Sequence, residues 1–307
     1  MDKPIIKQLL VPLDGSKLAE SVLPLVTQLA KKINVSVTLI HIIEKDAPEK
    51  IHGQRHLTRP DQAQEYLNSL AAAADFKGIT VNFHVHESSV KNVAKSISEH
   101  SQELNQDLVV LCTHGSGGLH DLLFGSIAQQ VIALGNTPVL LINPSNENTV
   151  IKCGFKNFLI PLDGNPEHEQ VLEFSSELAK ICGAGLHLLM AIPQYGSMSG
   201  EMTIVNRLLP GTTSKMMDMI VPDAEEYLKM LKLKLEQSGL KVTTSASRNN
   251  PDRAIMETAK KTKADLIILA THGKKGADAL LEGSVTPKIS KSSKIPLLLV
   301  PVRVSNE

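Results

Sequence analysis

The chain contains one pattern twice, as "KQLLVPLDGSKLAESVLPLVTQLAKKINVSVTLIHII" at Lys7–Ile43 and as "KNFLIPLDGNPEHEQVLEFSSELAKICGAGLHLLMAI" at Lys156–Ile192. Each copy begins with a continuous apolar run, which is typical of a strand buried on both faces of a sheet. In the first copy, apolar residues then recur at helical spacing over Ser16–Lys32, and a second apolar run follows at Val35–Ile43. Strands separated by a helix predict parallel pairing with a right-handed crossover.

The duplication extends over the rest of the chain. "DLVVLCTHG" from Asp107 matches "DLIILATHG" from Asp265, and "TPVLLI" matches "IPLLLV" near the end of each copy. The second copy is longer, and its additional residues lie between Ile192 and Asp265. We therefore predict two α/β domains, over residues 1–146 and 153–303, each with a five-stranded parallel sheet and helices on both faces.

Periodicity predicts the other elements of the first copy. We expect Ser88 or Ser89 to cap the helix over Val90–His100. The expected strands are Thr80–His86, Leu108–Cys112 and Val139–Ile142, and the expected helices are Asp61–Phe76, Val90–His100 and Gly125–Leu134.

Composition excludes several classes of function. The 307 residues carry 32 basic and 32 acidic side chains, so no net charge attracts nucleic acid or an anionic membrane. Aromatic residues make up 3% and tryptophan is absent, which argues against stacking on single-stranded nucleic acid. No apolar run approaches the roughly 18 residues of a membrane span, and no signal peptide is evident. The 3 cysteines form no CxxC pair, and we expect a reducing, cytoplasmic location.

An aspartate follows the first strand of each copy. It lies in "VPLDG", which contains Pro12 and Asp14, and in "IPLDG", which contains Pro161 and Asp163. Ligands of parallel sheets bind beyond the carboxyl ends of the strands, where a carboxylate could accept hydrogen bonds from an adenine amine or from ribose hydroxyls. The alternative is a simple Asp-Gly turn that leads into a helix cap. Both interpretations stay open at this point.

A glycine-containing loop follows the fourth strand of each copy, as "THGSGGLHDLLFGS" and as "THGKKGADALLEGS". In both copies the same spacing separates a first glycine from a Gly-Ser pair that opens a helix. The glycines let a phosphate approach the backbone, and the free amides of a helix N-terminus bind anions. The alternative is a glycine turn with a serine cap. The residues concerned are Gly115, Gly125 and Ser126 in the first copy and Gly273, Gly283 and Ser284 in the second.

The loop matches neither of two better-known phosphate-binding motifs. A Walker A Lys-Ser/Thr is missing, and "GSGGLH" lacks the third glycine of a dinucleotide fingerprint. His114 and His272 stand beside the two loops without the partners of a catalytic triad. We therefore expect no catalytic residues.

Two histidine pairs occur in the first copy only, His52 with His56 and His84 with His86. Each pair could place two rings on one face of its segment. No third ligand follows either pair, so we expect surface histidines and no metal site.

With these motifs the chain resembles the universal stress protein family in its tandem form. The resemblance implies two Rossmann-like domains, of the adenine nucleotide α-hydrolase-like type, that bind ATP through the aspartate and a G-x2-G-x9-G-[S/T] loop. Cys112 and Ala270 stand at the first glycine of that motif, and Lys274 follows its middle glycine in the second copy. The resemblance also implies adenine contacts at Ile42 and Ala191, and phosphate-loop contacts at Ile127 and Val285.

The departures from the family motif predict unequal sites. Cys112 is larger than Ala270, and only the second copy carries Lys274 and Lys275 to neutralise phosphate charge. We therefore expect the second copy to bind the nucleotide more tightly.

The resemblance implies a cytoplasmic stress-response protein that binds ATP, with or without Mg²⁺, and has no dedicated catalytic apparatus. One alternative is a nucleotide-independent interaction module, and another is a slow ATPase. The family pairs its domains through their last strands, so the two copies are expected to form an intramolecular pseudo-dimer. Self-association into a homodimer stays open.

Overall fold

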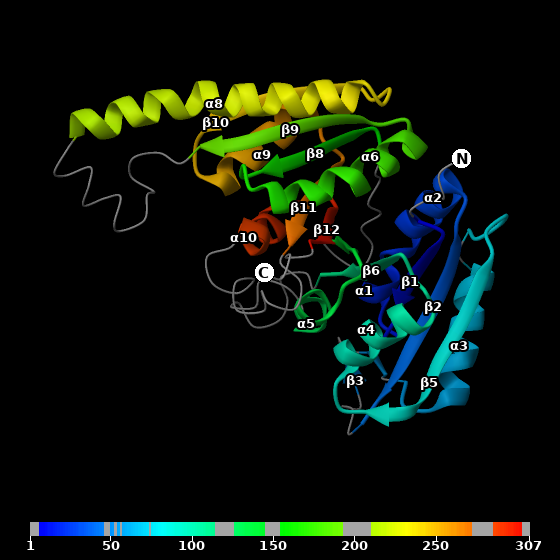
Figure 1. Cartoon of the computed structure of the whole chain (residues 1–307). Coiled ribbons are helices and arrows are strands. Elements are labelled where there is room, and N and C mark those ends of the chain that lie inside the picture. The colour runs from blue at the N-terminus through cyan, green and yellow to red at the C-terminus, as the bar shows by residue number, and fades with distance from the viewer. Residues whose placement is uncertain are drawn as a thin grey trace. The chain divides into compact units, whose positions relative to one another are not determined.

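The computed structural model describes residues 6–45, 50–51, 54–55, 57–73, 75–113, 126–144, 154–192, 210–271 and 285–302. The chain divides into two units (Figure 1). Unit 1 comprises residues 1–153 and 270–307, and unit 2 comprises residues 154–269. The predicted domain ranges, 1–146 and 153–303, stay a prediction, because this division assigns the last segment of the chain to unit 1.

Unit 1 is built around a mostly parallel sheet in the order β12-β7-β6-β1-β2-β5. Its strands are β1 (Gln8–Pro12), β2 (Ser36–Glu44), β5 (Val81–Val90), β6 (Leu108–Cys112), β7 (Val139–Ile142) and β12 (Leu297–Pro301), and β3 (Lys50–Ile51) pairs with β4 (Gln54–Arg55) apart from them. Its helices are α1 (Lys17–Glu20), α2 (Leu23–Ile33), α3 (Pro60–Ala73), α4 (Val93–Glu103), α5 (Ser126–Leu134) and α10 (Val285–Ser292).

Unit 2 repeats the architecture with parallel strands in the order β10-β9-β8-β11. Its strands are β8 (Asn157–Leu162), β9 (Gly185–Ile192), β10 (Val242–Arg248) and β11 (Leu266–Thr271), the last of which ends beyond the division between the units. Its helices are the 3-10 helix η1 (Pro166–Glu169), α6 (Gln170–Cys182), α8 (Pro210–Glu236) and α9 (Pro251–Thr262).

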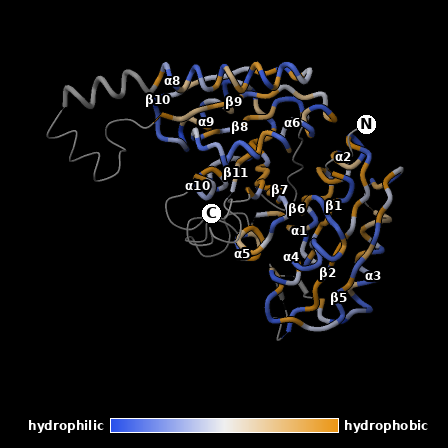
Figure 2. Tube along the Cα trace, viewed as in Figure 1, coloured by the Kyte–Doolittle hydropathy of each residue, from blue (hydrophilic) through white to orange (hydrophobic). Residues whose placement is uncertain are grey.

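Burial explains why the central strands form a sheet covered on both faces. The three central residues of β1 and seven consecutive residues of β2 are buried. Side chains of a strand alternate between faces, so continuous burial requires packing on both sides. Figure 2 shows these strands as hydrophobic segments, whereas hydrophilic and hydrophobic residues alternate along the described part of α8. The predicted α/β class with parallel sheets and helices is confirmed.

The edge of the unit 1 sheet is closed by an antiparallel strand from the end of the chain. β12 pairs with β7, with Leu298 opposite Leu140. Both side chains are buried, at 1% and 2% exposed. An apolar strand such as β7 would otherwise present unpaired backbone groups, so this pairing protects it.

Two local expectations were wrong. The helix predicted over Ser16–Lys32 is interrupted between α1 and α2, where Pro24 occupies the first turn of α2 and has no amide hydrogen to continue α1. The predicted cap at Ser88 or Ser89 lies within β5, and Asn92 caps α4 instead by accepting from the amide of Lys95 at 2.8 Å. Among the described residues, no helix is long and apolar enough to cross a membrane.

Candidate functional site

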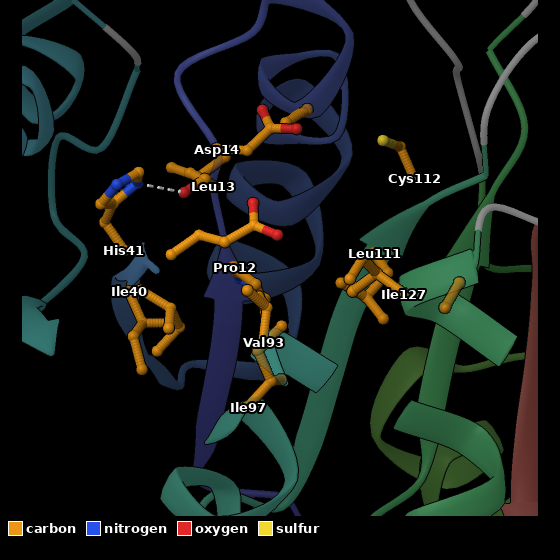
Figure 3. A pocket seen from close by; sticks show the side chains of 14 residues that line it. Pro12, Leu13, Asp14, Ile40, His41, Val93, Ile97, Leu111, Cys112 and Ile127 are labelled. Atoms are coloured by element: carbon orange, nitrogen blue, oxygen red, sulfur yellow. Dashed lines mark hydrogen bonds between the residues drawn. The ribbon is translucent and has the colours of Figure 1, made fainter. Parts of the chain in front are cut away.

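A pocket in unit 1 opens at the carboxyl ends of β1, β2 and β6 (Figure 3). This is the sheet edge at which parallel α/β proteins bind ligands. Five of the predicted site residues lie around it, namely Pro12, Asp14, Ile42, Cys112 and Ile127. The other lining residues are Leu13, Ala19, Ile40, His41, Glu44, Val93, Ile97, Leu111 and Ala128.

The turn after β1 sets the position of Asp14. Gly15 has a φ of 90°, a conformation that L side chains rarely adopt. The amide of Ser16 donates to Oδ1 of Asp14 at 2.9 Å, and the Ser16 hydroxyl caps α1 by accepting from the amide of Ala19 at 3.1 Å. Asp14 therefore forms the turn but does not cap the helix. Among the residues that the structure describes, its Oδ2 has no hydrogen-bond partner.

The floor of the pocket is apolar. Figure 3 shows Ile40, Val93, Ile97, Leu111 and Ile127 around its lower part, with Asp14 and Cys112 above them. An apolar pocket with a few polar groups at its mouth is the usual arrangement for binding a small organic ligand.

His41 was missed by the sequence reasoning, although it supports the pocket. Its side chain is buried on β2, and its Nδ1 lies 2.7 Å from the carbonyl oxygen of Leu13. Its Nε2 lies 3.0 Å from the carbonyl oxygen of Leu57. The ring thus joins the end of β1 to the segment before α3, and it helps to fix the backbone that carries Asp14.

Cys112 contributes a neutral thiol. It occupies the position of the first motif glycine and ends β6. Burial of its sulfur and, to a smaller degree, the charge of Asp14 raise its pKa to about 12. The group facing Asp14 is therefore a protonated thiol, since the thiolate form is disfavoured beside a carboxylate.

We expect alkylation of Cys112 by iodoacetamide at pH 8 to be at least about tenfold slower than in the urea-unfolded chain, because only the thiolate reacts. The rate should still rise between pH 8 and 10, whereas an ordinary thiol with a pKa of about 8.5 begins to level off there. Peptide mass spectrometry measures the modification at this residue. Equal rates in the folded and unfolded chain would contradict the environment described for the thiol.

In unit 2 the turn after β8 has the same form. Gly164 has a φ of 82°, and the amide of Asn165 donates to Oδ1 of Asp163 at 3.0 Å. Here the other carboxylate oxygen, Oδ2, has a partner, because Nδ1 of His168 lies 2.8 Å from it. Ala19 occupies the position of His168 in the first copy. The two aspartates therefore form equivalent turns through Oδ1, but only Asp163 has a described hydrogen-bond partner at Oδ2.

Each aspartate also has a tyrosine and a glutamate nearby. In unit 2, the Tyr227 hydroxyl donates to Glu169 at 2.9 Å, and burial together with Glu169 and Asp163 raises the tyrosine pKa. In unit 1, burial together with Glu20 and Asp14 raises the pKa of Tyr66. The sequence carried a signal for this arrangement, since "QEYL" in α3 and "EEYL" in α8 follow the second strand of each copy.

The remaining predicted residues are not all brought together by the described structure. Ser126 is the first residue of α5, and its role at an anion-binding helix terminus stays a prediction. Pro161 lies near the end of β8 and Ala191 near the end of β9, both in unit 2, whereas Ala270 and Val285 belong to unit 1. Gly115, Gly125, Gly273, Lys274, Gly283 and Ser284 lie outside the described residues.

Comparison with known proteins identifies the family. The model of the Universal stress protein family matches residues 6–143 and 154–301. A universal stress protein of Methanocaldococcus jannaschii is 28% identical over 156 residues, covering 50% of this chain and 88% of the relative. The universal stress protein E homolog of Haemophilus influenzae is 24% identical over 291 residues, covering 92% of this chain and 87% of the relative.

Solved structures support the fold. A universal stress protein from Archaeoglobus fulgidus superposes with a TM-score of 0.68 at 17% identity and covers 97% of both chains. At this identity the likeness concerns the fold, which extends over the whole tandem chain.

Proposed function

The chain belongs to the universal stress protein family, and from that premise we propose that it binds ATP at the carboxyl ends of its strands and acts as a cytoplasmic stress-response protein. The observation that carries this proposal is the pocket of unit 1, in which Asp14 stands over an apolar floor. Nucleotide binding would regulate the protein by favouring the conformation that binds it, without a dedicated catalytic step.

The chemistry of the pocket fits an adenine nucleoside. A flat, largely apolar base suits a floor formed by Ile40, Val93 and Leu111. Asp14 offers a carboxylate oxygen for a ribose hydroxyl or an adenine amine, because its turn uses the other oxygen. The neutral thiol of Cys112 adds no charge that would repel a nucleotide.

The first turn of α5 supports the placement of the phosphates. Ile127 and Ala128 of this turn line the pocket, and α5 begins at Ser126. The unpaired amides of a helix N-terminus and the helix dipole favour an anion there. When bound, Mg²⁺ would neutralise part of the phosphate charge.

The experiment is equilibrium dialysis of the purified full-length chain against radiolabelled ATP, together with mass spectrometry of small molecules released from the protein. We expect saturable binding of ATP and a higher melting temperature in its presence. Labelled GTP and AMP serve as controls for base and phosphate. No binding at millimolar ATP, with a properly folded chain, would overturn the proposal and favour a nucleotide-independent interaction module.

A measurement of ATP hydrolysis tests the remaining alternative, a slow ATPase. The described pocket of unit 1 holds Asp14 and Glu44 but no arginine or lysine that could stabilise charge during phosphoryl transfer. We therefore propose binding without appreciable hydrolysis. Release of phosphate with and without Mg²⁺ measures this directly, and turnover that saturates with ATP would assign a slow ATPase instead.

A further inference from the structure

Three histidines meet between β5 and α4 of unit 1. His84 and His86 lie two residues apart on β5, so they share a face of the strand, and His100 lies near the end of α4. One ligand nitrogen from each of the three lies within 4.8 Å of the other two. The expectation that the β5 pair lacks a third ligand was therefore wrong, because the fold brings in His100.

A carboxylate next to the cluster, that of Glu103, orients the ring of His100. Nδ1 of His100 lies 2.7 Å from Oε2 of Glu103, and Nε2 of His100 lies 2.9 Å from Nδ1 of His86. Glu103 accepts the Nδ1 hydrogen of His100, so the Nε2 lone pair is directed toward His86. Metal-ligating histidines usually donate their other ring hydrogen to a carboxylate in this manner.

One ring nitrogen of the cluster makes no hydrogen bond to the described residues. Within the described part of the chain, Nε2 of His84 is buried and has no hydrogen-bond partner. The ring of His84 packs edge-on against His100, with centroids 4.6 Å apart. A buried polar nitrogen without a partner is costly unless it meets a ligand.

We propose that His84, His86 and His100 form a binding site for a divalent transition metal ion of the Zn²⁺ type, with Glu103 as the group that orients His100. Three imidazoles at Zn–N distances of about 2.0–2.1 Å place their nitrogens about 3.3 Å apart in tetrahedral geometry. The ligand nitrogens of the three histidines already lie within 4.8 Å of one another, so each pair would have to approach by at most about 1.5 Å to reach that separation. Without metal, Nδ1 of His86 carries the hydrogen that is donated to Nε2 of His100. In the bound form this hydrogen would lie on Nε2 of His86 instead, so that Nδ1 could bind the metal without loss of a proton. A fourth position stays available for water or an anion.

The second copy of the domain lacks the ligands and provides a matched comparison. In the pairing of β10 with β9, Ser245 and Ser247 take the places that His84 and His86 take between β5 and β2. Serines at these places are therefore compatible with the fold. The metal would bind to unit 1 alone, where it would join the outermost strand β5 to α4.

The experiment uses the full-length chain stripped with EDTA and titrated with Zn²⁺ by calorimetry and with Co²⁺ by absorption spectroscopy. We expect one equivalent of metal with the intense visible absorption of four-coordinate Co²⁺, and a melting temperature that rises with Zn²⁺. The double variant His84→Ser/His86→Ser, which copies the second domain, should weaken metal binding at least 100-fold.

Two further variants separate a metal site from a structural cluster. His187→Ser removes a partly buried histidine of β9 outside the cluster and should leave the stoichiometry unchanged. Glu103→Gln should weaken binding by about 10- to 100-fold while leaving the metal-free melting temperature nearly unchanged. Failure of the parent chain to bind one equivalent of either metal, or undiminished binding by a folded His84→Ser/His86→Ser variant, would overturn the proposal.

Discussion

Leu140→Asp should abolish the cooperative unfolding of unit 1. The side chain is 2% exposed in β7, between Val110 of β6 and Leu298 of β12. An unpaired carboxylate at such a position costs several kcal/mol, which is comparable with a whole domain stability of about 5–15 kcal/mol. Circular dichroism during urea denaturation measures the loss, as a transition that weakens or disappears in the variant.

Phe83→Asp is the matched control for this variant. Phe83 also lies on a strand of unit 1, but its side chain is 37% exposed on β5. A charge there stays hydrated, so the change should cost about 1 kcal/mol or less, mostly through strand propensity. Equal losses in the two variants would show that burial at β7 is not what stabilises the unit.

Two variants in the paired strands β7 and β12 test whether β12 belongs to unit 1. Leu140→Ala and Leu298→Ala should each destabilise the protein by about 2–5 kcal/mol through loss of buried side-chain atoms. Because the two leucines are paired, the double variant should deviate from the sum by about 0.5–3 kcal/mol. Strict additivity would mean that the two strands do not form a common edge in solution.

The strands could be predicted closely because continuous burial leaves a continuous apolar run in the sequence. Leu108–Cys112 and Val139–Ile142 match β6 and β7 residue for residue. Helix ends were predicted less well, since they depend on single backbone groups. Pro24 interrupts the single helix that was predicted over Ser16–Lys32, because it cannot donate a backbone hydrogen bond. Asn92, rather than Ser88 or Ser89, accepts from a free amide in the first turn of α4. Propensity ranks both residue types as caps but does not say where the strand ends.

The site was predicted only where chain order determines position. In a parallel sheet, the ends of neighbouring strands meet at one edge, and so Asp14, just after β1, and Cys112, the last residue of β6, could be placed together. His41 and Tyr66 belong to the same region through side-chain packing, which a linear pattern does not record. His100 could not be assigned to the cluster from the sequence, because only the fold brings Nε2 of His100, near the end of α4, to 2.9 Å from Nδ1 of His86.

We expect Asp14→Ala to weaken ATP binding by unit 1 about 10- to 100-fold, the effect of losing a hydrogen bond to a charged group. The change leaves the Ser16 cap of α1 in place, so the fold should persist. Asp14→Asn separates the two uses of the side chain. Its amide oxygen can still accept from the Ser16 amide in the turn, but the charge that a ribose hydroxyl or adenine amine would meet is gone. Titration with fluorescent ATP, fitted to two sites, measures both variants.

The second copy provides the comparison that decides how this carboxylate acts. Oδ2 of Asp163 lies 2.8 Å from Nδ1 of His168, so a nucleotide that used Asp163 would have to compete with that contact, whereas the sequence predicts that Lys274 and Lys275 of the same copy would favour its phosphates. His168→Ala, which copies Ala19 of the first domain, should therefore tighten binding at the second site, and Asp163→Ala should weaken it. If the nucleotide uses the aspartates, these two variants must change affinity in opposite directions. Unchanged affinity in both, together with unchanged affinity in Asp14→Ala, would mean that the aspartates only build their turns.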